Sequence, residues 1–297
     1  MQFLARHFAH QTTIHHGKLI IWVLLLGYSA GVVAAAGSPS PLAQALAALG
    51  ILIAFGHAVL ALGLTDALAF LGLCLVITFA IENLSIATGF PFGHYHFEVA
   101  ADLPHVGRVP IIVGPLYFAM GYFSWVIGGI LLGADGRPGR TFSRFAQPVV
   151  AAFVMVQWDV VMDPPNATLG HAWVWHDGGG YFGVPLSNFL GWSLTVWLFF
   201  QAFALVFGRL DPQRISRNRP ASRGFWLIPI LLYLSVALSL AVPYFTENAG
   251  VIVDVAGTRW NAQDLRETTA IIALFTMVST SVLAFFRLVE DMPRQTR

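Results

Sequence analysis

Asp159 and Asp163 are the residues of this sequence whose type and spacing are best suited to catalysis. They lie four positions apart in the segment WDVVMDPP, so a helix would carry both carboxyl groups on one face. Because the residue before a proline resists the helical conformation, we expect Pro164 to end the helix at about Asp163, where the macrodipole disfavours negative charge. Apolar surroundings and a like-charged neighbour also favour the neutral form. The pair is therefore predicted to supply a carboxylic acid that donates a proton.

Two further acids follow other apolar segments. Glu82 stands beside Asn83 at the end of one of them and is the next candidate for a buried catalytic acid. Glu247 follows VPYF, but its loop also carries ordinary charges, which makes it a weaker candidate. Either aspartate or Glu82 alone has an alternative interpretation, in which it caps loop amides or contacts water at a membrane interface. The spacing of the two aspartates favours a catalytic role for that pair.

Aromatic residues crowd around these acids in the sequence. An aromatic belt at a membrane interface accounts for many such residues. The functional alternative is that some rings face inward, bind a long apolar substrate and stabilise a transient cation through their π faces. The rings near the acids are Phe90, Phe92, Tyr95, Phe97, Trp158, Trp173, Trp175, Tyr181, Phe182 and Trp192.

Five histidines, His94, His96, His105, His171 and His176, fall in the same loops. Their spacings, HxH in HYH and HxxxxH in HAWVWH, are not the HxxxH and HxxHH boxes with which membrane desaturases and hydroxylases ligate iron. We therefore expect no metal and no other cofactor, and we interpret His94 or His171 as a hydrogen-bond partner of a carboxylate. The segment DVVMD also resembles the aspartate-rich motifs that hold Mg²⁺ against a diphosphate, but the sequence offers too few basic residues nearby for that chemistry.

The composition places these residues in a membrane protein. Hydrophobic residues make up 57% and charged residues 10% of the 297-residue chain, whereas soluble domains carry about 25% charged residues. Apolar runs of spanning length predict an all-α, polytopic membrane helix bundle of about eight transmembrane helices in a single domain, residues 1–297. The net charge of +1 gives no indication of a nucleic-acid partner, and Cys74, the only cysteine, excludes an intramolecular disulfide. The expected spans are residues 18–36, 42–62, 66–82, 110–133, 146–163, 185–208, 225–245 and 268–287.

Basic residues predict the orientation in the cell membrane. Most Lys and Arg residues fall before the first span, after the last one, or in the loops that a cytoplasmic N-terminus places inside, so both termini are expected in the cytoplasm. Arg108, Arg259 and Arg266 are the exceptions. Most acidic residues lie in or beside the other set of loops. We therefore expect the active site at the outer side of the membrane.

Two of these outer segments resemble a known family. TGFPFGHYHF after Glu82, and WDVVMDP followed by WVW and GGGYFGVPLSNFLGW, resemble the membrane-bound carotenoid 1',2'-hydratases of the bisanhydrobacterioruberin hydratase and γ-carotene hydratase type. The resemblance covers about residues 75–200. Phe97 stands where a tyrosine is expected, and residues 100–108 depart from the family's pattern.

The resemblance implies an enzyme of carotenoid biosynthesis that adds water to the terminal C=C bond of an acyclic carotenoid end group. The product is a tertiary alcohol, and neither dioxygen nor a redox cofactor is required. Implied substrates are of the lycopene, γ-carotene or bisanhydrobacterioruberin type, and implied partners are the lipid bilayer and other enzymes of carotenoid biosynthesis. A neutral carboxylic acid would protonate the alkene, aromatic faces would hold the tertiary cation, and a positioned water would attack it.

We assign roles to the candidate residues on this basis. Asp159 is expected to be the general acid, Asp163 its coupled partner or the water-positioning base, and Glu82 the next candidate for either role. The remaining candidates orient water or carboxyl groups, or line the end-group pocket. They are His94, Tyr95, Tyr181 and Asn188 for orientation, and Trp158, Trp173 and Trp175 for the lining.

Three other functions stay open on the sequence. An oxygen-dependent membrane hydroxylase or desaturase of carotenoids or lipids would need a metal and would take its oxygen from dioxygen. A non-catalytic carotenoid-binding protein would leave the pigment unchanged. Cyclisation or isomerisation of the end group would pass through the same cation and differ only in how that cation is consumed.

Overall fold

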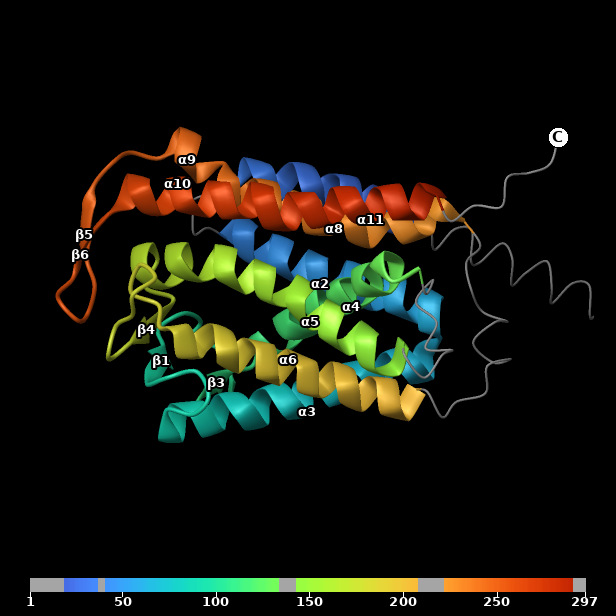
Figure 1. Ribbon diagram of the computed structural model, residues 1–297, viewed down its shortest axis with the longest axis horizontal. Helices are drawn as coiled ribbons and strands as arrows, with labels where there is room; N and C mark the ends of the chain where they lie inside the picture. The colour runs from blue at the N-terminus through green and yellow to red at the C-terminus, as the bar shows by residue number, and fades with distance from the viewer. Residues whose placement is uncertain (1–18, 37–40, 134–142, 208–221, 291–297) are drawn as a thin grey trace, which may run out of the picture.

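The computed structural model describes residues 19–36, 41–133, 143–207 and 222–290 as an all-α bundle (Figure 1). Seven of its helices are long and apolar enough to cross a membrane, and a shorter apolar helix, Leu19–Ala34, precedes them. These eight segments match the positions of the predicted spans, which confirms a polytopic membrane fold. The helices are α2 (Pro41–Leu62), α3 (Leu64–Thr88), α4 (Val113–Leu131), α5 (Ser143–Pro164), α6 (Leu186–Phe207), α8 (Arg223–Ala241), α9 (Pro243–Thr246), α10 (Ala262–Ala273) and α11 (Ser279–Glu290).

Helix α4 is the centre of the bundle. Nearly all of its side chains are buried, and it contacts α2, α3, α5, α8 and α11. Helices α3 and α5 both pack against α4 and α6, so Glu82 on α3 and the aspartates on α5 come from two helices with the same neighbours. This packing brings acids that are 77 or more residues apart in the sequence into one part of the bundle.

Two predicted helix ends are wrong, and both errors concern acids. Helix α3 continues six residues past Glu82 to Thr88 and ends at Gly89, whose left-handed φ of 80° suits a residue without a side chain. The chain also does not leave the helix at Asp163, because it runs through Pro164 into a π-helical turn, η1 (Pro165–Leu169). Glu82 and Asp163 therefore lie inside helices, and the predicted C-terminal dipole effect on the aspartates does not hold.

The helix can continue through Pro164 because another side chain replaces the missing backbone donor. Proline has no N–H, so the carbonyl of Val160, four residues earlier, loses its helical partner. The hydroxyl of Tyr181 donates a hydrogen bond to that carbonyl oxygen at 3.1 Å. An unpaired carbonyl inside a membrane is costly, and this contact removes the cost.

The same arrangement recurs at two further prolines in the interior of described helices, Pro148 of α5 and Pro229 of α8. In each case a side chain from a neighbouring helix donates to the carbonyl that lies four residues before the proline. Gln201 Nε2 donates to Arg144 O at 3.2 Å, and His57 Nε2 donates to Phe225 O at 2.9 Å. These polar side chains of the apolar spans therefore have a structural role.

Short antiparallel strand pairs gather at one end of the bundle, at the left of Figure 1. β1 (Tyr95–Phe97) pairs with β4 (Trp173–Trp175), with Tyr95 opposite Trp175 and Phe97 opposite Trp173. The other pairs are β2 (His105–Val106) with β3 (Val109–Pro110), and β5 (Val251–Val253) with β6 (Arg259–Asn261). The β1–β4 pair joins the two loops that carry the family motifs and lies over the ends of α3 and α5.

Substitution of Tyr181 by Phe tests the proline contact. Tyr181→Phe leaves the Val160 carbonyl without a donor and is expected to cost about 1–3 kcal/mol, seen as a lower melting temperature of the purified protein. In a Pro164→Ala background the backbone N–H of residue 164 supplies the donor, so the same substitution is expected to cost much less. Equal losses of stability in both backgrounds would show that the Tyr181 hydroxyl does not donate to the Val160 carbonyl.

Candidate active site

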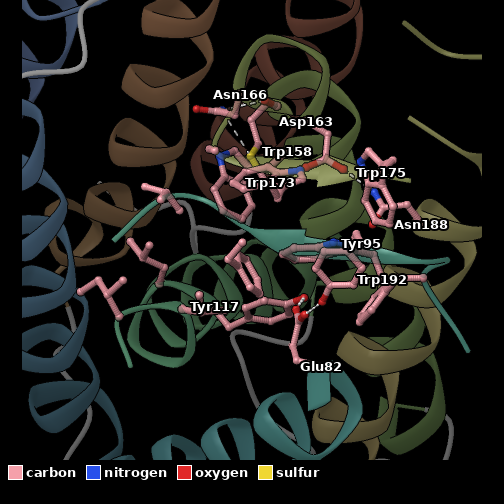
Figure 2. Close-up of a pocket in the computed structure, with 18 residues that line it drawn as sticks. Glu82, Tyr95, Tyr117, Trp158, Asp163, Asn166, Trp173, Trp175, Asn188 and Trp192 are labelled. Atoms are coloured by element: carbon pink, nitrogen blue, oxygen red, sulfur yellow. Dashed lines mark hydrogen bonds between the residues drawn. The ribbon is translucent and has the colours of Figure 1, made fainter. Parts of the chain in front are cut away.

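A cavity of about 300 Å³ lies between α3, α4, α5 and α6 beneath the β1–β4 pair (Figure 2). Its wall is mostly apolar and aromatic. Among the described residues that line it, the ionisable side chains are two carboxyl groups and two tyrosine hydroxyls, with no Lys, Arg or His. The lining residues are Glu82, Phe92, Tyr95, Phe97, Val99, Ile112, Val113, Leu116, Tyr117, Trp158, Met162, Asp163, Asn166, Ala172, Trp173, Trp175, Asn188 and Trp192.

Glu82 is held by two tyrosines. The hydroxyl of Tyr117 on α4 donates to Glu82 Oε1 at 2.6 Å, and the hydroxyl of Tyr95 on β1 donates to Oε2. Both contacts are visible at the lower side of Figure 2. A carboxylate accepts hydrogen bonds on both oxygens, and each oxygen keeps a further acceptor site. The two donors favour the ionised form of Glu82, and the remaining acceptor sites leave it able to accept a proton from water.

The two aspartates are joined through Asn188 of α6. Its side-chain amide donates to Asp163 Oδ2 and, at 3.3 Å, to Asp159 Oδ2. Asp163 lines the cavity, whereas Asp159 is fully buried behind it and does not. Because Asn188 occupies the Oδ2 atoms, the Oδ1 atoms are the positions left to carry protons. The Oδ1 of Asp159 is buried without any partner among the described residues.

The electrostatics of the cavity follow from the absence of cations in its lining. An isolated buried carboxylate is costly, so three buried acids in one region are not all held as anions. Burial, together with the charge of Glu82 and the hydrogen bond to it, raises the pKa of Tyr95 well above its usual value. The hydroxyl of Tyr95 therefore keeps its proton and remains a hydrogen-bond donor to Glu82.

Aromatic rings form the rest of the wall. Trp192 stacks on Tyr117 with ring centroids 4.2 Å apart and planes 10° apart, and Trp158 meets Trp192 edge-on at 5.9 Å. Tyr95 packs against Trp175 at 4.7 Å across the β1–β4 pair. The acids are therefore bordered by π faces rather than by cationic groups. Such faces attract positive charge without reacting with it.

The structure brings most of the predicted site residues together. Seven line the cavity, and Asp159 contacts one of these seven, Asn188. Tyr181 instead caps the Val160 carbonyl, and burial raises its pKa to about 12. The seven are Glu82, Tyr95, Trp158, Asp163, Trp173, Trp175 and Asn188.

His94 lies outside the cavity. Its Nδ1 contacts Asp177 Oδ2 at 2.9 Å, so it does pair with a carboxylate, but both side chains are more than half exposed. His96 contacts His176 at 2.8 Å and Glu98 at 2.8 Å on the same exposed surface. Within the described ranges, no group of three or more His, Cys, Asp or Glu side chains is arranged to hold a metal ion.

Sequence reasoning missed Tyr117 and Asn166 and assigned no role to Trp192. Tyr117 lies within an apolar span with no polar neighbour to single it out, and only the packing of α4 against α3 brings it to Glu82. Asn166 follows two prolines, and because we expected the helix to end before them, we did not consider it as a site residue. The side-chain amide of Asn166 donates to Met162 O at 2.7 Å, and Asn166 lines the cavity.

Fold and cavity together define a class: multi-pass membrane proteins that enclose an apolar, tryptophan-rich cavity beside buried carboxyl groups. Residues 42–256 match the model of a family described as "Carotenoid biosynthesis protein", and the chain belongs to that family. Its role is therefore in carotenoid biosynthesis.

A curated relative, bisanhydrobacterioruberin hydratase from Haloarcula japonica, is 26% identical over 135 residues, which are 46% of this chain and 44% of that relative. The chain thus matches less than half of the relative's length. No solved structure matches the chain.

Loss of the Asn188 amide is expected to destabilise the protein. Asn188→Leu removes the donor shared by Asp159 and Asp163 and leaves two buried acceptors unpaired, at about 1–3 kcal/mol for each. We expect a clearly lower melting temperature in detergent. Ser193→Ala is the matched control on α6, because Ser193 donates only to Phe189 O of its own helix, at 2.8 Å. Equal stability of the two variants would contradict the bridging role of Asn188.

Proposed function

We propose that this protein adds water to the terminal C=C bond of an acyclic carotenoid end group and yields a tertiary alcohol. The observation that carries the proposal is the pairing of two unlike carboxyl environments in one aromatic cavity. Asp163 has an Oδ1 with no hydrogen-bond partner among the described residues, and Glu82 has two tyrosine donors. The family supports a carotenoid substrate, and the printed name of the Haloarcula japonica relative supports hydration as the reaction.

Asp163 is the general acid in this proposal. In its neutral form the proton sits on Oδ1, because Oδ2 accepts from Asn188. Transfer of that proton to the less substituted carbon of the terminal alkene breaks the π bond and leaves a tertiary cation on the neighbouring carbon. General acid catalysis of this kind contributes about 10²–10⁴-fold to a rate.

Asp159 has a supporting role in place of the catalytic one predicted from the sequence. It lies behind Asp163, does not line the cavity, and contacts the same amide of Asn188 at 3.3 Å. Its carboxyl group therefore orients Asn188, which in turn keeps Asp163 Oδ2 occupied and directs the reactive proton to Oδ1.

The aromatic wall stabilises the cation, and Glu82 completes the reaction. Trp158, Trp192 and Tyr95 line the same cavity as the acids, and in this proposal their ring faces stabilise the developing positive charge. A water molecule attacks the cation through its oxygen and forms the C–O bond. The carboxylate of Glu82 takes the released proton, and one proton must return from Glu82 to Asp163 before the next turnover.

The site lies at the end of the bundle that carries the strand pairs, and in this proposal that end lies at the membrane surface, where an apolar chain and water meet. We propose that this end faces the outer side of the cell membrane and that the substrate enters from the bilayer. The substrate is of the lycopene, γ-carotene or bisanhydrobacterioruberin type, and other enzymes of the same biosynthesis supply it.

The origin of the oxygen atom tests the reaction. We expect a bacterium that accumulates lycopene or γ-carotene and expresses this protein to make a carotenoid alcohol that carries ¹⁸O when it is grown in ¹⁸O-labelled water. Label from ¹⁸O₂ in place of water would identify an oxygenase. Unchanged pigment of every substrate type offered would favour a binding role, and an unoxygenated isomer would indicate cyclisation or isomerisation.

Substitution of each acid tests the assignment of roles. Asp163→Asn and Glu82→Gln keep the shape of the side chains but remove the acid and the base, so each is expected to lower hydration at least about 100-fold. Asp159→Asn is expected to lower hydration less than either of these two substitutions. Asp177→Asn, at an exposed acid of the same end of the bundle, is the control and should hydrate normally. Full activity of Asp163→Asn together with loss in Asp159→Asn would return the acid role to Asp159.

A further inference from the structure

The indole N–H of Trp175 is a buried donor without a partner. Trp175 is 6% exposed and lines the cavity, and its Nε1 is the indole nitrogen that lies buried without a hydrogen bond in the described part of the chain. A buried donor left unpaired costs about 1–3 kcal/mol, so its retention indicates a partner that is present during function.

The ring that carries this donor is firmly placed. Trp175 is the last residue of β4, directly opposite Tyr95 of β1, and its ring packs on the Tyr95 ring at 4.7 Å. The next residue extends the pairing, because the backbone N–H of His176 donates to His94 O at 2.9 Å. Figure 2 shows Trp175 beside Tyr95 and on the same side of the cavity as Asp163 and Asn188. The N–H is thus held on a strand rather than on a mobile loop.

The chemistry of the donor limits what can pair with it. An indole nitrogen only donates, so its partner must bring an acceptor atom. A hydrocarbon end group has none, and no acceptor of the described residues, the oxygens of Glu82 and Asp163 included, forms a hydrogen bond with this nitrogen. The acceptor that enters the cavity with an apolar substrate is therefore water, and after the reaction it is the new hydroxyl group.

We propose that Trp175 is a positioning residue that holds the attacking water through its indole N–H, with Glu82 as the acceptor for that water's proton. This inference rests on the proposed hydration. A water held by a donor and an acceptor has its lone pair directed at the cation, which is the arrangement needed for capture by oxygen rather than loss of a proton. Trp175 thereby decides whether the cation becomes an alcohol or returns to an alkene.

The fate of the cation measures this role separately from the rate of its formation. In deuterated water, protonation of the alkene places deuterium on carbon, and a cation that is not captured loses a proton and gives back an alkene that carries deuterium. The ratio of alcohol to deuterium-bearing alkene, read by mass spectrometry of the extracted pigment, does not depend on the amount of folded protein.

Trp175→Phe keeps an aromatic ring and removes the N–H. We expect the ratio of alcohol to deuterium-bearing alkene to fall about tenfold, the factor that about 1.4 kcal/mol gives. Trp173→Phe, on the same strand and in the same cavity, is the matched control and is expected to slow turnover while it keeps the wild-type ratio. Trp175→His retains a ring N–H and is expected to keep alcohol as the main product, which provides a second test where Trp175→Phe does not fold.

The outcomes separate this inference from the function on which it rests. A wild-type protein that forms no alcohol in deuterated water overturns the hydration itself. A wild-type protein that hydrates, with the same ratio in Trp175→Phe, overturns only the role of the indole N–H. An equal fall of the ratio in Trp173→Phe, or a fall in Trp175→His, also overturns it, because the effect would then come from ring size.

Discussion

The burial of acidic groups in a cavity without cationic lining residues is the constraint on which the rest of this structure depends. A buried carboxylate charge without a partner is costly, and the described part of the chain places no Lys, Arg or His in the cavity wall to offset it. The protein meets this constraint with neutral donors: two tyrosine hydroxyls at Glu82 and one asparagine amide shared by Asp159 and Asp163. The result is a set of unlike carboxyl groups, one suited to give a proton and one suited to take it.

The architecture serves the same constraint. Each side chain that donates to one of these acids comes from a different element than the acid: α4 and β1 for Glu82, and α6 for the aspartates of α5. The site therefore exists only in the assembled bundle. The prolines inside α5 and α8 follow this rule too, because side chains from other segments donate to the carbonyls they leave unpaired. Gln201, His57 and Tyr181 thus restore backbone hydrogen bonds, whereas Tyr117, Tyr95 and Asn188 hold acids, and the two roles lie side by side at Pro164 and Asp163.

Much of the fold and part of the candidate site could be predicted from the sequence, and there are physical reasons why the rest could not. Hydropathy located the spans because apolar length is a local property, and the spacing of Asp159 and Asp163 indicated a shared helix face. The end of α5 was predicted wrongly because the donor that lets the helix pass Pro164, the Tyr181 hydroxyl, is distant in sequence. The difference between Asp159 and Asp163 depends on which one faces the cavity, and Tyr117 reaches Glu82 only through helix packing. Both are tertiary properties, and periodicity alone does not encode them.

The central claim is that a carboxylic acid of the cavity protonates a carbon atom of the substrate. The most direct test uses purified wild-type protein in lipid vesicles, under argon and with no added cofactor, supplied with an acyclic carotenoid in deuterated water. The account predicts a tertiary alcohol with one deuterium bound to the carbon next to the alcohol-bearing carbon. An alcohol without carbon-bound deuterium, or a product formed only when dioxygen is admitted, would contradict it.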